Sequence, residues 1–410
     1  MLYGQVRFFA PLRMTNQVCN GVREGGKHLL YWLLYQKLFP YFRMFRIFRY
    51  LTFRTAFASL TALAICLLIG PFVIEKLRDF QIGQYIREEG PKDHQKKAGT
   101  PTMGGVLICI AILVPTLLWS DLSNPLVWIV IFATVAFGGI GFMDDYIKVV
   151  HRRNLGLSAK AKLGLQMLAS TLIAIVLIAM QRGGTYSTRL VVPFAKRFRP
   201  DLVMGWMLHL HHPWSLLAPL AFLPFVIFVV LVISFSSNAV NLTDGLDGLA
   251  IGCTIIAAAA LAVLTYVSGH VVFSDYLELQ RMPMAGELTI FCGAMVGSAI
   301  GFLWYNAHPA EIFMGDVGSL ALGGAIGTVA VLIKQELLLP FIGGVFVLEA
   351  GSVILQVGSY KLRNGKRIFK MAPLHHHFEL AGWSESKVIV RFWILALVFA
   401  LFALTTLKLR

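Results

Sequence analysis

Two adjacent carboxylates, Asp144 and Asp145, stand near the end of a long apolar stretch in the sequence Gly-Phe-Met-Asp-Asp-Tyr. If this stretch is a helix, negative charge at its C-terminal end opposes the helix dipole and is locally unfavourable. A protein that retains such a pair can use it to hold a cation or to transfer a proton, and ionisable groups at membrane-helix ends are functional candidates. The alternative is a solvated pair at the membrane interface.

A second acidic group lies in the run Asn-Leu-Thr-Asp-Gly-Leu-Asp, from Asn241 to Asp247. Its carboxylates, Asp244 and Asp247, are three residues apart and would share one face of a helix. No Lys or Arg occurs at positions 200–280, so no basic residue nearby in the sequence neutralises them. The pair could serve a magnesium ion or the donor groups of a nucleotide, or it could form only a capping turn.

A further carboxylate, Asp316, stands in the motif Phe-Met-Gly-Asp-Val-Gly-Ser, which begins at Phe313 and follows Asn306. A long apolar run comes next, so Asp316 could be the N-cap of a helix. Capping and metal ligation can coexist at one carboxylate, and Asp316 is therefore also a candidate ligand.

Three consecutive histidines, His375, His376 and His377, follow Met-Ala-Pro-Leu and precede Phe-Glu. Adjacent side chains point in different directions, and zinc sites use Cys and His at wider spacing, so the run is not typical of zinc. Donors beside a diphosphate fit the pattern as well, and a histidine run unrelated to chemistry is the remaining alternative.

The segment Lys-Lys-Ala-Gly-Thr-Pro-Thr-Met-Gly-Gly, which contains Lys97 and Thr102, leads into another apolar stretch. Lysines beside a glycine-rich helix start could hold a phosphate through charge and free backbone N–H groups. A basic anchor with Pro at a helix start explains the pattern as well. Clustered carboxylates without thiolates favour a hard ion with oxygen ligands, and so Mg²⁺ over zinc.

Apolar stretches that can cross a bilayer must position these motifs. The chain has 410 residues, of which 57% are hydrophobic and 14% charged, whereas a soluble protein carries about a quarter charged residues. A helix of about 20 apolar residues crosses a ~30 Å hydrocarbon core. We predict an all-α integral membrane protein with ten spans, at residues 55–75, 101–120, 124–143, 162–180, 217–236, 246–267, 287–304, 317–334, 337–360 and 388–407.

The basic residues orient the ten spans. Connections 1–2, 3–4 and 9–10, on one side, carry six, five and six Lys or Arg, whereas connections 2–3, 6–7 and 8–9 carry none, one and one. The positive-inside rule therefore places the first set, and with it all five motifs, in the cytoplasm and both termini in the periplasm. Connection 4–5, with five basic residues, and the basic N-terminus depart from this pattern.

We divide the chain into a basic N-terminal extension, residues 1–50, and a ten-helix transmembrane domain, residues 51–410. Residues 29–50 could form a basic amphipathic helix in the membrane interface. The net charge is +15, but the basic residues lie in connections and at the N-terminus, so contact with lipid headgroups explains them and no nucleic acid is expected. The five cysteines are scattered singly, which signals neither a disulfide framework nor a zinc site.

The motifs, in their order along the chain, resemble the polyprenyl-phosphate N-acetylhexosamine-1-phosphate transferase family, and within it the enzymes that transfer phospho-N-acetylmuramoyl-pentapeptide. The resemblance covers roughly residues 50–410. It rests on Gly99-Thr-Pro-Thr-Met-Gly-Gly105, Asp144-Asp145-Tyr146, the run from Asn238 to Gly248, the run from Phe313 to Ser319, and the histidine block. It implies ten transmembrane helices, both termini periplasmic, a homodimer in the bacterial inner membrane and a requirement for Mg²⁺.

The reaction that the resemblance implies moves phospho-N-acetylmuramoyl-pentapeptide from its UDP carrier onto undecaprenyl phosphate, giving lipid I and UMP. Asp316 matches the family's magnesium ligand, and Asp144, with Asp145 beside it, matches the carboxylate that deprotonates or positions the lipid phosphate. The residues matched to the nucleotide and diphosphate pocket are Lys97, Thr102, Asn241, Asp244, Asp247, Asn306, Phe313 and Gln356. The three histidines match the motif that separates muramoyl-pentapeptide enzymes from their N-acetylglucosamine relatives.

Two other functions stay open at this point. A sibling transferase would use UDP-N-acetylglucosamine, although the run from His375 to Glu379 argues against it. An ion-coupled secondary transporter would place its carboxylates near the bilayer midplane between inverted repeats, whereas these carboxylates lie at helix ends and no repeat is apparent. Within the transferase reading, direct attack by the lipid phosphate and a covalent aspartyl intermediate are both compatible with the sequence.

Overall fold

The described part of the chain is a bundle of helices. The structure, a computed structural model, describes residues 41–79, 100–151, 156–193, 195, 198–205 and 218–407. An isolated β-bridge joins Arg189 and Asp201, and no strand occurs among these residues. Helices suit so apolar a sequence because each backbone N–H and C=O is satisfied inside its own segment, as a lipid environment demands.

The long helices follow the predicted apolar stretches closely. They are α1 (Leu51–Asp79), α3 (Pro125–Val150), α4 (Ala159–Arg182), α6 (Leu223–Thr243), α7 (Leu249–Gly269), α9 (Leu288–Asn306), α10 (Gly315–Leu332), α12 (Gly344–Leu362) and α14 (Glu385–Thr405). These account for nine segments of the described chain that are long and apolar enough to cross a membrane. The chain is accordingly a multi-pass membrane protein.

Shorter elements join the long ones or flank them. They are η3 (Arg43–Arg49), α2 (Gly105–Trp119), η5 (Ala218–Phe222), α8 (Val271–Tyr276), η6 (Pro283–Glu287), α11 (Leu339–Ile342) and α13 (Leu374–Leu380). At 15 residues, α2 spans about 22 Å and is shorter than the predicted stretch 101–120, because residues 101–104 are not helical. The predicted stretch 337–360 divides into α11 and α12.

Some predictions fall on residues that the structure does not describe. Lys97 lies outside the described residues, as does most of the predicted interfacial helix at 29–50. The described end of that segment, Arg43–Arg49, is a 3-10 helix.

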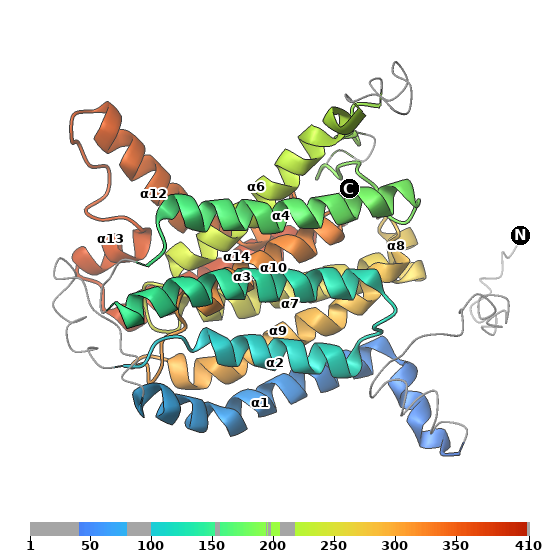
Figure 1. Cartoon of the computed structure of the whole chain (residues 1–410), viewed down its shortest axis with the longest axis horizontal. Helices are drawn as coiled ribbons and strands as arrows, with labels where there is room; N and C mark the ends of the chain where they lie inside the picture. Colours follow the sequence, from blue (N-terminus) through green and yellow to red (C-terminus); the bar gives the residue numbers. More distant parts are fainter. Residues whose placement is uncertain are drawn as a thin grey trace, which may run out of the picture.

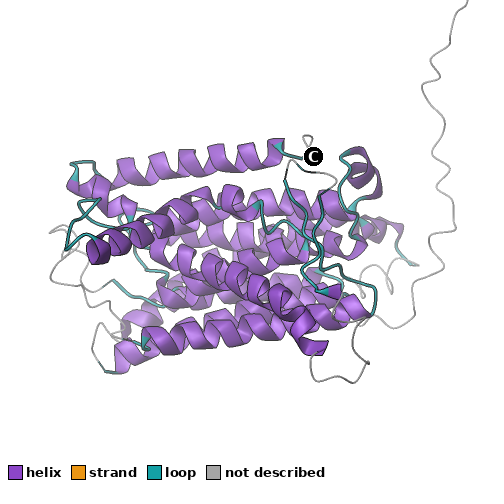
Figure 2. Cartoon of the chain, turned by 90° about the horizontal axis from the view of Figure 1, so that it is seen from above, coloured by secondary structure: helices purple, strands orange, loops and turns teal. Residues whose placement is uncertain are grey.

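Helix α10 forms the centre of the bundle. All residues of this helix from Val317 to Leu332 are buried, because α2, α3 and α6 pack around it. Helix α9 packs against α1, α7 and α2. Figure 2 shows the helices side by side along a common direction. A helix that is apolar and buried all round has no free face, so its ends are the places where it can present polar groups.

Polar groups do gather at one end of the bundle. Figure 1 shows the end of α3, the start of α4 and the short helix α13 together at its left-hand end. The first turn of α10 meets the last turns of α3 there, as the contacts below establish. The bundle thus brings segments that are far apart in the sequence to one polar end.

Candidate active site

Three carboxylates converge where α3 meets the start of α10. Single ligand oxygens of Asp144, Asp145 and Asp316 lie within 4.8 Å of one another, and Asp144 and Asp145 are each only 3% exposed. The close approach depends on Gly141, one turn before Asp145 on α3, because a Cβ at this position would collide with the backbone of Asp316. The two acidic motifs singled out in the sequence therefore form one site.

Two lysines complete this cluster. The Nζ atom of Lys148 lies 2.6 Å from Asp144 Oδ2, 3.2 Å from Asp145 Oδ1 and 2.7 Å from Asp316 Oδ2. The Nζ atom of Lys162, in the first turn of α4, lies 2.8 Å from Asp316 Oδ2. We name these five residues the carboxylate–lysine cluster.

Sequence reasoning missed both lysines as site residues and counted them only as basic residues of a connection. The signal for Lys148 was present, since it follows Asp145 and Asp144 by three and four positions and so shares their helix face. Nothing local indicates Lys162, because its contact with Asp316 is made between α4 and α10.

Hydrogen bonds orient each carboxylate of the cluster. Asp145 Oδ2 accepts from the backbone N–H of Val317 at 3.2 Å, and Asp144 Oδ1 accepts from Leu157 N–H at 2.8 Å. Asp316 Oδ1 accepts from the Asn241 amide at 2.6 Å. Asp316 lies in the first turn of α10 without capping it, since the N-cap residue is Met314. Its negative charge is favourable at this N-terminal end.

The acidic loop, which we define as residues 244–248, joins α6 to α7. Burial, and then the charges of Asp316, Asp145 and Asp247, raise the pKa of Asp244 to about 8. Asp244 is thus close enough to the carboxylate–lysine cluster to respond to its charge, and it holds a proton in much of the neutral range.

The other carboxylate of this loop, Asp247, faces a histidine. Its Oδ2 lies 3.2 Å from His308 Nδ1 and accepts from Ala310 N–H at 3.2 Å. Glu385, at the start of α14, accepts from the Asp247 backbone N–H at 3.3 Å. Asn306 accepts from Gly248 N–H at 3.0 Å and so ties the loop to the end of α9.

The Gly-rich segment before α2 runs beside the segment before α10. Phe313 N–H donates to Pro101 O at 2.8 Å, and Gly104 N–H donates to Phe313 O at 2.9 Å. Thr102 lies near Gly315, the first residue of α10. Pairing of these two segments places Thr102 beside the first turn of α10, the turn that carries Asp316.

The three histidines of α13 have three different surroundings. His375 is fully buried, and its ring rests against Gly245 of the acidic loop. His376 Nδ1 lies 2.8 Å from Glu379 Oε2, whereas His377 Nδ1 accepts from Lys370 N–H at 3.1 Å. The three rings thus have different contacts, although the rings of His375 and His376 lie with their centroids 4.2 Å apart.

Gln356 of α12, predicted to line the pocket, bonds elsewhere. Its side chain accepts from Ile368 N–H at 2.9 Å and Phe369 N–H at 3.0 Å, and it donates to Phe369 O at 3.0 Å. In this structure the Gln356 side chain therefore binds the backbone of Ile368 and Phe369, which precede the histidine motif. Its hydrogen bonds do not reach the carboxylate–lysine cluster.

Two protein-family models and several named proteins match the part of the chain that forms this site. The glycosyl transferase family 4 model matches residues 127–334, and the phospho-N-acetylmuramoyl-pentapeptide-transferase signature 1 matches residues 97–109. Phospho-N-acetylmuramoyl-pentapeptide-transferase from Acidobacterium capsulatum is 80% identical over 93% of this chain and 100% of its own length. The chain belongs to the phospho-N-acetylmuramoyl-pentapeptide-transferase family.

Two further members of this transferase family are also similar to the chain over most of its length. The proteins of the same name from Koribacter versatilis and Solibacter usitatus are 74% and 65% identical, each over 93% of this chain and 100% of their own length. The family 4 match covers the carboxylate–lysine cluster and the acidic loop but ends before the histidine motif. Both the site and the histidines lie within the length shared with the named relatives.

The cluster of this transferase-family protein fits a hard divalent cation. All three candidate ligands are carboxylates within 4.8 Å of one another, and oxygen-only sets favour Mg²⁺ over zinc. In the structure, the ammonium groups of Lys148 and Lys162 lie beside Asp316 and supply positive charge there. Asp316, Asp144 and Asp145 are the residues that would hold a divalent ion.

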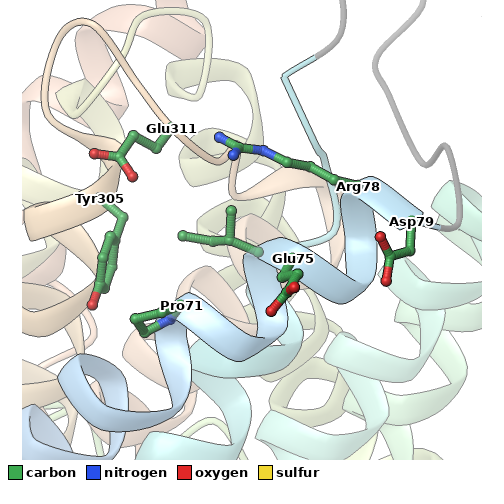
Figure 3. Close-up of a pocket in the computed structure, with 7 residues that line it drawn as sticks. Pro71, Glu75, Arg78, Asp79, Tyr305 and Glu311 are labelled. Atoms are coloured by element: carbon green, nitrogen blue, oxygen red, sulfur yellow. The ribbon is translucent and has the colours of Figure 1, made fainter.

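A separate pocket of about 450 Å³ lies between the end of α1 and the loop after α9. Figure 3 shows Arg78 and Glu311 on its rim, with Tyr305 on the opposite wall from Glu75. No residue of the carboxylate–lysine cluster or of the histidine motif lines it. This pocket is therefore separate from the carboxylate–lysine cluster.

Proposed function

We propose that this protein transfers phospho-N-acetylmuramoyl-pentapeptide from UDP-N-acetylmuramoyl-pentapeptide to undecaprenyl phosphate, forming lipid I and UMP. The observation that carries the proposal is the carboxylate–lysine cluster at one end of an apolar bundle, in a chain 80% identical to a named transferase. Both reactants are anions, so a site for their reaction needs positive charge and fixed positions. Lys148 and Lys162 contribute two positive charges, held in place by the carboxylates of the cluster.

The bond changes in the proposed reaction are those of a phosphoryl transfer. A phosphate oxygen of the lipid forms a bond to the sugar-proximal phosphorus of the diphosphate. The bond from this phosphorus to the bridging oxygen breaks, and the electron pair leaves with UMP. Lys148 and Lys162 stabilise the negative charge that accumulates on the oxygens during transfer. Asp316, with Asp144 and Asp145, would hold Mg²⁺, which would supply further stabilisation of negative charge.

We assign the proton of the lipid phosphate to Asp144. Its Oδ1 is held by Leu157 N–H at 2.8 Å and its Oδ2 faces Lys148 at 2.6 Å. The second pKa of a phosphomonoester lies near 6, so most of the lipid phosphate is already deprotonated at neutral pH. Asp144 therefore positions the nucleophile and accepts the proton from the minor protonated form. Asp145 holds Lys148 and the first turn of α10.

The donor substrate is proposed to lie along the acidic loop and the histidine motif. Asn241, Asp244 and Asp247 would contact the uridine diphosphate portion, and Asp247 and Asn306 are held by the contacts described above. The remaining proposed contacts are Lys97, Thr102, Phe313, Gln356, His375, His376 and His377.

The membrane arrangement is part of the proposal. Ten membrane crossings, with α2 as the shortest, leave both termini periplasmic and the cluster at the cytoplasmic face of the bacterial inner membrane. The support is the excess of basic residues in connections 1–2, 3–4 and 9–10. UDP-linked sugars are available on the cytoplasmic side. A homodimer is also proposed from the family resemblance.

A donor-exchange assay tests the function. Purified protein is supplied with undecaprenyl phosphate, Mg²⁺ and either UDP-N-acetylmuramoyl-pentapeptide or UDP-N-acetylglucosamine, and UMP and the lipid product are quantified. We expect product only with the muramoyl donor. Product with UDP-N-acetylglucosamine alone would indicate the sibling transferase, and substrate uptake into vesicles without lipid product would indicate a transporter. Exchange of labelled UMP into the donor without lipid acceptor would favour the covalent aspartyl route.

A further inference from the structure

A buried carboxylate on α12, Glu349, lies behind the histidine motif and has no role in the site described above. Glu349 and His375 are both 0% exposed. Glu349 Oε1 accepts a hydrogen bond from the backbone N–H of His375 at 3.2 Å, and its Oε2 lies 3.2 Å from His375 Nδ1. One carboxylate thus contacts both the main chain and the ring of the same histidine.

The opposite edge of the His375 ring rests on the acidic loop. Its Nε2 and Cε1 atoms occupy the space that a Cβ at Gly245 would need. Gly245 is not among the glycines with positive φ, so the imidazole ring, and not the backbone, is what excludes a larger residue here. The ring therefore packs between Glu349 and the residue that follows Asp244.

Three polar atoms of this arrangement are buried without a hydrogen-bond partner among the described residues. They are Nδ1 and Nε2 of His375 and Oε2 of Glu349. The approach of Nδ1 to Oε2 is short enough for a hydrogen bond but is not aligned for one. Buried polar groups in folded proteins are nearly always satisfied. A small rotation of the ring would align Nδ1–H with Oε2, and Nε2 would then face the loop.

We propose that Glu349 is a positioning residue that holds the His375 imidazole against Gly245 and thereby fixes the acidic loop for the phosphorylated donor substrate. The carboxylate favours a proton on Nδ1, in the way that an acidic partner fixes the tautomer of a functional histidine. The inference rests on the proposed transferase activity and names two further residues, Glu349 and Gly245, that determine how the donor binds.

Isosteric and conservative variants of Glu349 test this role. Glu349→Gln keeps the volume and an acceptor for His375 N–H, but its amide donates to Nδ1 and reverses the proton preference of the ring. We expect kcat with the muramoyl donor to fall by about 10–100-fold, the usual effect of losing such an orienting partner. The KM for undecaprenyl phosphate should not change. Glu349→Asp, which retains the charge, should recover part of the lost rate.

The melting temperature and a second pair of variants separate positioning from folding. Gly245→Ala should raise the KM for the donor because its Cβ displaces the ring, whereas Gly358→Ala, on α12 with open space around it, should match the wild type. In a His375→Ala background, Gly245→Ala should produce no further loss of donor binding, because the ring that it displaces is gone. This lack of additivity is the signature of a shared contact.

The outcomes are distinguishable. The inference fails if Glu349→Gln keeps the wild-type kcat, or if Glu349→Gln lowers only the melting temperature. It also fails if Gly245→Ala weakens donor binding equally with and without the His375 ring. A wild-type protein that forms no lipid product from either donor would instead contradict the proposed function itself.

Discussion

The Nζ atom of Lys162 lies 2.8 Å from the Oδ2 atom of Asp316, across 154 positions of the chain. Both residues lie in the first turn of their helices, α4 and α10. The position suits Asp316 but not Lys162, because positive charge at a helix N-terminus opposes the helix dipole. The carboxylates that Lys162 faces offset this unfavourable position. The contact joins two helix starts at the site of the proposed chemistry.

The first prediction concerns this lysine. Lys162→Met removes one of the two cations that face Asp316, so anionic reactants meet less positive charge during phosphoryl transfer. We expect kcat to fall by about 10²–10³-fold, as when one charge-stabilising donor is lost from an active site. The control is Lys160→Met, since Lys160 is exposed on the same helix. Equal rates for the two variants would remove Lys162 from the mechanism.

The second prediction concerns the amide that orients Asp316. Asn241 Nδ2 donates to Asp316 Oδ1 at 2.6 Å and to Ser319 Oγ at 2.8 Å. Asn241→Asp replaces a donor by a further negative charge beside Asp316 and should lower kcat by about 10–100-fold. Ser319→Ala leaves the bond to Asp316 intact and should lower it much less. Steady-state rates of UMP release compare the two variants, and the opposite ranking would refute the assignment.

The third prediction concerns pH. The pKa of Asp244 in the folded protein is about 8, against 3.8 for the free side chain, because the carboxyl group is desolvated and lies near other carboxylates. Between these values the folded state retains a proton that the unfolded state releases, so this group lowers stability progressively as pH rises toward 8. Asp244→Asn carries no such charge. Without divalent cations, its melting temperature should exceed that of the wild type by an increasing margin from pH 5 to 8.

Above pH 8 this margin should become constant, because both states of the wild type are then ionised at Asp244. Melting curves recorded in detergent at each pH provide the measurement. Parallel curves for Asp244→Asn and the wild type across the whole range would mean that Asp244 has an ordinary pKa in the folded protein.

The fourth prediction separates stability from activity. At the other end of α10 from Asp316, the buried Lys334 and Glu336 form an ion pair of 2.9 Å, and Lys334 Nζ lies 5.1 Å from the Tyr186 ring centroid. Lys334→Met leaves Glu336 buried and unpaired, which should lower the free energy of unfolding by about 3–5 kcal/mol. The length of α10 separates this pair from the cluster, so kcat per folded molecule should be unchanged.

The matched double variant, Lys334→Met with Glu336→Met, should recover much of this stability, because no unpaired charge stays buried. Thermal unfolding and UMP release are measured on the same preparations. A large fall in kcat without a fall in melting temperature would show that this end of the bundle takes part in the reaction.

The fold was largely predictable from the sequence because hydropathy and helix length are local properties. Nine of the ten predicted stretches contain helices long enough to cross a membrane among the described residues. The exception, 101–120, starts with residues that pair with the segment before α10. Such a pairing is a tertiary contact, and the local sequence from Pro101 to Gly104 does not indicate it.

The site was only partly predictable. Motif composition indicated Asp144, Asp145 and Asp316, and the structure brings them together. Lys162 and Glu349 were missed because the residues that give them a role, Asp316 and His375, are far away in the sequence and are brought to them only by helix packing. Local pattern reasoning has no access to such contacts.

The most direct test of the central claim is the rate of lipid product formation by Asp316→Asn, compared with the wild type at saturating Mg²⁺ and both substrates. Asp316 faces Lys148, Lys162 and Asn241 in the structure, so the variant removes the charge on which the cluster is built. We predict a loss of at least about 10³-fold, with a melting temperature that still indicates a folded protein. A folded Asp316→Asn protein that forms lipid product within a few-fold of the wild-type rate would contradict the account.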